Sequence, residues 1–302
     1  MDNISSLYLS KFGFLEKHVD LTSYTGFRTK SYASAMFIPS GVEGLCFLIR
    51  NKSDFECITT IGAGYNLLIR DGGIKGLTMS LGNNFGKISF RRSENFTDID
   101  VGASVKSCEF ASECQKQGLS GAEFLSVIPG TIGGALYMNA GCFGAEISQI
   151  VLNVHLVTDE GKTYTISADD IKYGYRSSSI PSDWIIVGAT FRCTSSSIES
   201  VSHTVKKLRE KKLSTQPTCG LSCGSVFKNP TRHCAWKIID ELGFRGASLG
   251  GAKVSEKHSN FLVNTGKAKA SDIEQLGEKI RKEAASRLGI HLEWEIQRLG
   301  EF

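Results

Sequence analysis

The sequence lacks the features that mark several common classes of protein. It has no basic stripe: 35 Lys and Arg residues exceed 31 Asp and Glu residues by only four, and outside residues 203–212 they are scattered. A nucleic-acid-binding domain usually gathers its basic residues on one face, so the mild excess fits an anionic small substrate better. The N-terminal segment shows no basic start followed by an apolar core, and we therefore expect no signal peptide.

Paired cysteines are also missing. The nine cysteines form an odd set without a disulfide spacing, which favours reduced thiols and a cytoplasmic location. Cys219, Cys223, His233 and Cys234 resemble a zinc ribbon loosely and lie just after a basic segment, so a zinc-stapled nucleic-acid-binding module is one alternative. Adjacent His and Cys rarely reach one tetrahedral ion and no second paired set exists, so we expect no metal site.

Glycine is abundant instead, with 32 residues, about one and a half times the roughly 7% average. Residues 125–144, LSVIPGTIGGALYMNAGCFG, carry no charge. Their length suits a membrane helix, but Pro129, the Gly133–Gly134 pair and Asn139 argue against one. A buried structural loop is the plain alternative. Glycine-rich backbone can also surround a phosphate with N–H groups, and we predict that role.

A second glycine loop, GAGYN, covers residues 62–66. It begins like the dinucleotide-binding fingerprint G-x-G-x-x-G, but it lacks the third glycine and no helical pattern follows. The context therefore argues against a Rossmann fold.

The first half of the chain alternates short strand-like runs with glycine turns, and a hairpin is expected around Gly161. One helix is expected after Ser104 as its N-cap, ending before Gly118. Its predicted apolar face consists of Val105, Cys108, Ala111 and Cys114.

The character of the sequence changes near residue 200, where we place a domain boundary. Residues 195–213 become an amphipathic helix with Val201, Val205 and Leu208 on one stripe. A later helix is predicted to begin at a capping box formed by Ser271 and Glu274 and to end at Gly289. Its predicted apolar face consists of Ile273, Leu276, Ile280, Ala284 and Leu288.

Five motifs follow one another in a characteristic order: GAGYNLL, GLSGAEFLSVIPGTIGGALYMNAGCFG, KYGYRSSSI, CGSVFKNP and GGAKVSEKHSNFLVN. Together they resemble the UDP-N-acetylenolpyruvoylglucosamine reductase family over roughly residues 20–300. The resemblance implies an α+β protein: residues 1–200 form an FAD-binding domain of the non-Rossmann type, as in vanillyl-alcohol oxidase. Residues 201–302 form a smaller α+β substrate-binding domain, whose last strand returns Glu295 to the active site.

The resemblance also implies a reaction. NADPH reduces non-covalently bound FAD, and the enolpyruvyl ether of UDP-N-acetylglucosamine enolpyruvate is reduced to UDP-N-acetylmuramate for peptidoglycan synthesis, cell shape and division. Arg176 would stabilise charge on the substrate carboxylate, Ser225 would donate the proton, and Glu295 would share the charge or relay the proton.

The two glycine loops would bind FAD, and four basic residues and one asparagine of the later motifs would bind substrate. The expected cofactor residues are Gly62, Ala63, Gly64, Tyr65, Asn66, Leu67, Ile128, Pro129, Gly130, Thr131, Gly133, Gly134, Asn139, Ala140 and Gly141. The expected substrate residues are Lys228, Asn229, Lys253, Lys257 and His258.

Some positions depart from the family pattern: Tyr65 replaces the usual serine, Ser259 replaces an alanine, and Trp294 and Gln297 flank Glu295 where proline and arginine are common. The short segment between Arg176 and Trp184 indicates the compact form without a substrate-closing insertion.

We expect a monomer that binds neither nucleic acid nor membrane. An FAD-linked oxidase with the same type of flavin domain is the nearer alternative, but GSVFKNP and SEKHSNF favour the reductase.

Overall fold

The computed structural model describes residues 9–217 and 221–302, and the chain divides into two compact units. The first unit takes residues up to 16, 36–62 and 76–211, and the second takes residues 17–35, 63–75 and 212–302. Each unit is thus assembled from separate stretches of chain. The domain boundary expected after residue 200 stays a prediction.

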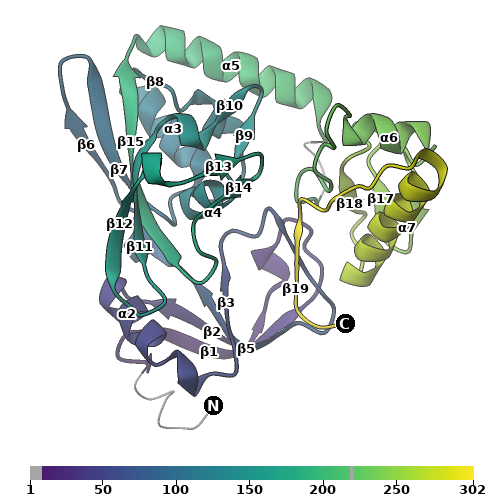
Figure 1. Ribbon diagram of the computed structural model, residues 1–302, viewed down its shortest axis with the longest axis horizontal. Helices are drawn as coiled ribbons and strands as arrows, with labels where there is room; N and C mark the ends of the chain where they lie inside the picture. The colour runs from purple at the N-terminus through teal and green to yellow at the C-terminus, as the bar shows by residue number, and fades with distance from the viewer. Residues whose placement is uncertain (1–8, 218–220) are drawn as a thin grey trace. The chain divides into compact units, whose positions relative to one another are not determined.

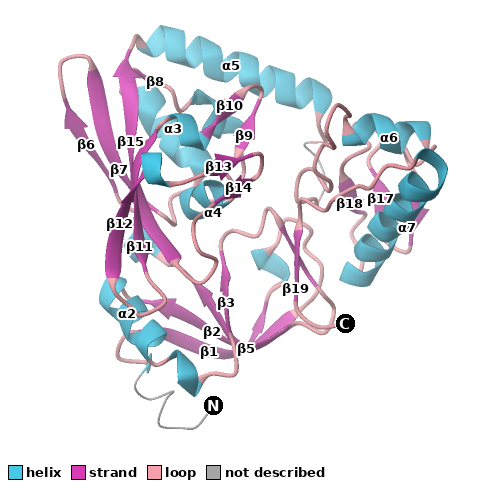
Figure 2. Cartoon of the chain, viewed as in Figure 1, coloured by secondary structure: helices cyan, strands magenta, loops and turns pink. Residues whose placement is uncertain are grey.

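Residues 13–80 form short strands and one α-helix, and glycine residues lie in several of the turns between them (Figure 1 and Figure 2). They are β1 (Gly13–Asp20), β2 (Tyr32–Pro39), α2 (Val42–Arg50), β3 (Ile58–Ile61), β4 (Leu67–Ile69) and β5 (Ile74–Ser80). A four-stranded sheet has the order β1–β2–β5–β3, in which β3 and β5 are parallel. The chain passes from one unit to the other within β1, β2 and β5.

The first unit is built on a six-stranded sheet with the order β12–β11–β15–β7–β6, with β8 paired to β15. Its strands are β6 (Ile88–Arg92), β7 (Phe96–Gly102), β8 (Leu119–Ser120), β11 (Val151–Val157), β12 (Thr163–Ser167) and β15 (Ile185–Ser195). In β7 every second residue is buried, namely Thr97, Ile99 and Val101, as expected for a strand with one face on a core. The hairpin predicted around Gly161 is confirmed as β11 and β12.

Helices α3 (Ser107–Lys116) and α4 (Ile132–Tyr137) share one hydrophobic core with this sheet. The sequence placed the N-cap of α3 at Ser104, which is wrong: the helix begins at Ser107, and the Ser104 hydroxyl donates to the Gly82 carbonyl at 2.9 Å. Cys108 is exposed and Val105 precedes the helix, so the buried face is formed by Phe110, Ala111 and Cys114.

The uncharged stretch 125–144 forms no continuous helix. It contains the end of a 3-10 helix (Glu123–Val127), helix α4 and the two-residue strand β9 (Gly141–Cys142), which pairs with β10 (Ala145–Glu146). None of the helices in the described part of the chain has the length and apolar character needed to cross a membrane. Helix α5 (Ile198–Thr215) confirms the predicted amphipathic helix, with Val201 and Val205 buried.

The second unit packs helices α6 (Ala235–Glu241) and α7 (Ala270–Leu288) on a small antiparallel sheet. This sheet consists of β16 (Ser248–Leu249), β17 (Ala252–Val254) and β18 (Leu262–Asn264). The C-terminal strand β19 (Gln297–Leu299) pairs in parallel with β4. On α7, Ile273, Leu276, Ile280 and Ala284 are buried, Leu288 is partly buried, and Gly289 ends the helix with φ 66°.

The predicted capping box of α7 is wrong, because the helix begins at Ala270 and not after Ser271. Its first amides are satisfied by Asp71, a residue from the turn after β4. The two carboxylate oxygens of Asp71 accept from the N–H groups of Ala270 and Ser271 at 2.8 and 3.1 Å. An acidic side chain at this end also interacts favourably with the helix dipole.

Asp71→Ala is expected to lower the free energy of unfolding by about 1–2 kcal/mol, because two amides of α7 lose their acceptor. Ser271→Ala, at the cap position predicted from the sequence, is the matched control and should change the free energy of unfolding by less than about 0.5 kcal/mol. Urea unfolding measures both values. Equal losses for the two variants would contradict the assignment of Asp71 as the cap.

Candidate active site

In the first unit, Gly62 lies beside Thr131 of the uncharged stretch. A Cβ added to Gly62 would lie 3.2 Å from the Thr131 hydroxyl oxygen. Gly130 has φ +105°, and an added Cβ there would have no atom within 4 Å. Within the described residues, the amides of Gly130, Thr131 and Gly134 have no backbone acceptor. Unused amides beside open space are what a diphosphate requires.

Two buried hydroxyl groups near this loop also lack a partner within the described residues, those of Ser126 and Tyr173. Burial raises the pKa of the Tyr173 phenol to about 12, so this group is a neutral donor. Buried polar groups are normally satisfied, so these two hydroxyls are among the exceptions in the described part of the chain. The glycine loop therefore fits FAD, with main-chain amides for the diphosphate and apolar residues for the ring system.

Asn139, an expected cofactor residue, lies in the same loop but its side chain is already engaged. It is buried with φ 43°, its amide donates to Glu146 and to the Gly174 carbonyl at 2.9 and 3.0 Å, and its oxygen accepts from Ser148 N–H. This side chain holds the glycine loop in shape, and a role in binding FAD stays a prediction.

Arg176 reaches this loop from a two-residue hairpin turn. Strands β13 (Tyr173–Gly174) and β14 (Ser177–Ser178) pair with Gly174 opposite Ser177, which leaves Tyr175 and Arg176 as the turn. Arg176 has φ 55°, and its Nη2 donates to the Gly141 carbonyl at 2.9 Å. A non-glycine residue in the left-handed region costs about 1–2 kcal/mol. Arg28 and Arg232 share this conformation, and a catalytic role for Arg176 stays a prediction.

In the second unit, Ser225 and Glu295 lie on paired stretches of backbone. Phe227 forms an antiparallel bridge with Trp294, the Glu295 N–H donates to the Val226 carbonyl at 2.8 Å, and the Lys228 N–H donates to the Glu293 carbonyl at 2.8 Å. The structure thus brings together the segments that carry two of the three expected catalytic residues. The strand at this end starts only at Gln297, so Glu295 precedes it.

Asn66 of the first glycine loop is attached to the same segment. Its side-chain amide donates to the Glu295 carbonyl at 3.0 Å, and its own carbonyl accepts from the Gln297 N–H at 2.9 Å. The side chain expected on FAD therefore fixes the backbone of Glu295. Its role in binding FAD stays a prediction.

A residue that the sequence did not single out, Asn260, anchors the segment after Ser225. It is 3% exposed, and its side chain forms two bonds with the backbone of Phe227, accepting from the N–H at 3.0 Å and donating to the carbonyl at 2.8 Å. Asn260 thereby joins the SEKHSNF motif to the CGSVFKNP motif. The place of Asn260, two residues after the candidate His258, is a weak signal in the sequence, since the partner of Asn260 lies 33 residues away.

The expected substrate residues already have partners in this unit. Lys228 lies 3.4 Å from Glu293, Lys253 forms an ion pair with Glu256 at 2.5 Å, and Lys257 donates to the Leu213 carbonyl. Asn229 accepts from the Ala235 N–H at the start of α6. Burial, with the charge of Arg245, lowers the pKa of His258, which packs against Phe261. Binding of substrate by these five residues stays a prediction.

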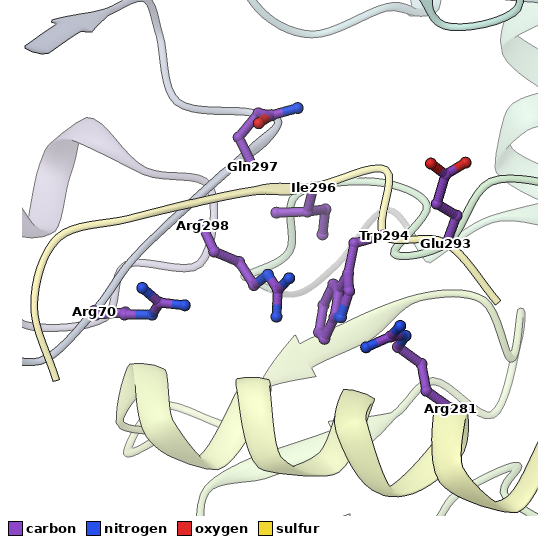
Figure 3. Close-up of a pocket in the computed structure, with 7 residues that line it drawn as sticks. All are labelled: Arg70, Arg281, Glu293, Trp294, Ile296, Gln297 and Arg298. Carbon is purple, nitrogen blue, oxygen red and sulfur yellow. The ribbon is translucent and has the colours of Figure 1, made fainter. Parts of the chain in front are cut away.

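A pocket of about 340 Å³ also lies in this unit (Figure 3). It contains the neighbours of Glu295 but not Glu295 itself, and its arginines are already paired with Glu274 and Glu278. We therefore do not take it as the substrate site. Its lining consists of Arg70, Arg281, Glu293, Trp294, Ile296, Gln297 and Arg298.

For the zinc alternative, Cys219 lies outside the described residues. Residues 9–217 and 221–302 contain no group of three or more His, Cys, Asp or Glu that could hold a metal ion. The Cys223 thiol instead donates to the carbonyls of Gly64 and Leu67, and burial raises its pKa to about 12. Cys223 thus acts as a buried packing residue between the first glycine loop and Ser225.

Comparison with known proteins agrees with this geometry. Residues 35–167 match the model of an FAD binding domain, and residues 216–299 match that of the C-terminal domain of UDP-N-acetylenolpyruvoylglucosamine reductase. The chain is therefore an α+β flavoprotein whose non-Rossmann FAD-binding domain is followed by a second domain of the reductase type.

Proteins that are similar over nearly their whole length point to the same family. The UDP-N-acetylenolpyruvoylglucosamine reductase of Anaplasma marginale is 39% identical over 288 residues, covering 95% of this chain and 94% of that protein. The one from Orientia tsutsugamushi (strain Boryong) is 39% identical over 96% of this chain and 95% of its own length. The crystal structure from Thermus caldophilus superposes with a TM-score of 0.83 at 27% identity, covering 96% and 100% of the two chains. The chain belongs to the UDP-N-acetylenolpyruvoylglucosamine reductase family, and the fold class and family predicted from the sequence are confirmed.

The backbone strain at Arg176 can be tested separately from its predicted catalytic role. Arg176→Ala and Arg176→Gly both remove the guanidinium and should be equally impaired in turnover. Only the glycine variant also relieves the positive φ, so it should be more stable than the alanine variant by about 1 kcal/mol. Urea unfolding of the two variants measures this difference. A less stable glycine variant would show that the turn does not strain Arg176.

Proposed function

We propose that this protein reduces the enolpyruvyl ether of UDP-N-acetylglucosamine enolpyruvate to UDP-N-acetylmuramate with NADPH, in peptidoglycan precursor synthesis. When bound, FAD supplies the hydride that it takes from NADPH. Membership of the reductase family supports this activity. The observation that carries the assignment of residues is the backbone pairing of the Ser225 and Glu295 segments.

The chemistry requires two groups from the protein besides the hydride donor. Arrival of hydride at the methylene carbon leaves negative charge developing toward the substrate carboxylate, and the neighbouring carbon must then receive a proton. Arg176 has fixed, permanently charged donors that match a carboxylate. Its hydrogen bond to the Gly141 carbonyl sets the direction in which the guanidinium points.

Ser225 is the proposed proton donor. A hydroxyl is a weak acid and needs a neighbouring group to assist the transfer. Glu295 is the candidate for that assistance, because its segment is hydrogen bonded to the residue that follows Ser225. Gly224, with φ +81°, allows the sharp change of direction just before Ser225.

The half-reactions test these roles separately. Ser225→Ala should leave anaerobic reduction of the flavin by NADPH unchanged, and it should slow the return of the oxidised flavin spectrum on addition of substrate by about 10²-fold or more. Ser222→Ala, three residues earlier in the same loop, serves as the matched control and should slow neither step. Rapid-mixing absorbance with product analysis measures both.

Two outcomes would contradict the proposal. Normal substrate-dependent reoxidation of the Ser225→Ala variant would remove Ser225 as the donor. Flavin in the unaltered protein that stays reduced until oxygen is admitted would favour the oxidase alternative.

A monomeric state and a cytoplasmic location are further proposals, which gel filtration and cell fractionation would check.

A further inference from the structure

The segment that carries Glu295 is held from two sides within the second unit. On one side its backbone is bonded to Val226 and Lys228, and Asn66 binds both the Glu295 carbonyl and the Gln297 N–H. Both backbone groups of Glu295 are thus occupied. What sets the segment against helix α7 is the side chain of the preceding residue, Trp294.

The indole of Trp294 occupies a notch that a glycine creates in α7. A Cβ added to Gly277 would lie 2.2 Å from Cη2 and 2.5 Å from Cζ2 of the indole. Glycine inside a helix is less favourable than alanine, because it loses more backbone freedom when the helix forms. A mid-helix glycine under a tryptophan ring therefore indicates that close approach of the ring outweighs the helix preference.

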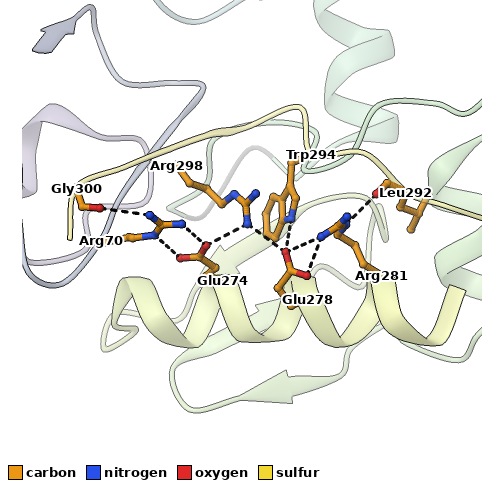
Figure 4. Close-up of polar contacts among 8 residues, drawn as sticks. All are labelled: Arg70, Glu274, Glu278, Arg281, Leu292, Trp294, Arg298 and Gly300. Carbon is orange, nitrogen blue, oxygen red and sulfur yellow. Dashed lines mark hydrogen bonds and ion pairs between the residues drawn. The ribbon is translucent and has the colours of Figure 1, made fainter. Parts of the chain in front are cut away.

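The orientation of the ring is fixed by charged groups (Figure 4). The indole Nε1 donates to Glu278 Oε1 at 2.7 Å, and the same carboxylate is bonded to Arg281 and Arg298. The Arg298 guanidinium also lies 4.7 Å from the indole centroid. Although burial acts to raise the pKa of Glu278, the bonds from Trp294 and Arg281 and the charges of Arg281 and Arg298 lower it overall, so the acceptor stays ionised.

The arginines extend this network along the helix. Arg298 contacts Glu274, which Arg70 binds through two bonds of 2.9 Å, and Arg281 Nε donates to the Leu292 carbonyl at 2.9 Å. Residues 292, 294 and 298 are therefore each tied to α7 or its partners. Glu295 lies between these anchored residues.

We propose that Trp294 is a positioning residue for the reduction: its indole, seated on Gly277 and bonded to Glu278, sets the place of the Glu295 carboxylate. This inference rests on the proposed role of Glu295. Gly277 leaves space for the indole of Trp294 and Glu278 accepts its N–H, so the three residues act together.

The test combines Trp294→Phe, Gly277→Ala and the double variant. Phenylalanine lacks the two indole carbons that an added Cβ would meet, so the clash exists only when tryptophan is present. Each single variant should reduce flavin with NADPH at the normal rate but slow substrate-dependent reoxidation by about 10-fold, since small misplacements of a reacting group are costly. The double variant should be no slower than Trp294→Phe alone, whereas independent effects would make it about 100-fold slower than the unaltered protein.

Thermal unfolding provides a readout that does not depend on activity. Gly277→Ala should lower the melting temperature in the presence of Trp294, and it should raise that temperature, or leave it unchanged, in the protein that already carries Trp294→Phe. The control variants are Trp184→Phe, another half-buried tryptophan with an aromatic neighbour, and Gly41→Ala, where an added Cβ meets nothing within 4 Å. Neither control should alter either half-reaction.

Three results would overturn the inference. Trp294→Phe with normal reoxidation, while Glu295→Gln is slow, would remove the positioning role and leave the proposed function intact. Equal slowing of both half-reactions would show a merely structural role for Trp294. Normal reoxidation in Glu295→Gln itself would instead defeat the proposed role of Glu295, and the inference with it.

Discussion

The second unit depends on hydrogen bonds between stretches of backbone that are far apart in the sequence. The last residues pair with Leu67–Ile69, with Asn66 and with residues 226–228, and the Gly73 carbonyl accepts from Glu301. Each bond contributes only about 0.5–1.5 kcal/mol net, but together they fix the register of the C-terminal segment. A shift by one residue would turn Glu295 away and bring Trp294 into its place, so the register is a condition of the proposed chemistry.

The conformation of the uncharged loop in the first unit reflects a different constraint: backbone amides must stay unpaired beside open space. Its shape is imposed by buried side chains, since Asn139 binds three partners, and by residues held in unfavourable conformations. Asn139, Phe143 and Arg176 all have positive φ. Such residues persist only when their surroundings determine them fully. These three lie in the stretch that fits a diphosphate or contact it, whereas His18, Arg28 and Arg232, the other non-glycine residues with positive φ in the described part of the chain, lie elsewhere.

The sequence predicted those features whose causes are local. Periodicity identified α5, α7 and the β11–β12 hairpin, and Gly289 marked the end of α7. The family motifs predicted which segments would carry the site, and Ser225 and Glu295 lie on paired segments. The cap of α7 could not be predicted, because Asp71 reaches it from 199 residues away. For the same reason the roles of Asn66 and Asn260 as backbone anchors, and the notch at Gly277, became visible only in three dimensions.

The ion pairs around Glu274 and Glu278 are better explained by the orientation that they give Trp294 than by a contribution to folding stability. Removing a carboxylate such as Glu274, 6% exposed, from water is costly, and well-packed apolar residues often stabilise a core as well as an ion pair does. An apolar cluster would permit many orientations of a tryptophan ring, whereas a carboxylate held by two arginines accepts the indole N–H in one direction. Arg70 extends this order to the turn whose Asp71 caps the same helix. The network therefore trades stability for a single arrangement of the segment that carries Glu295.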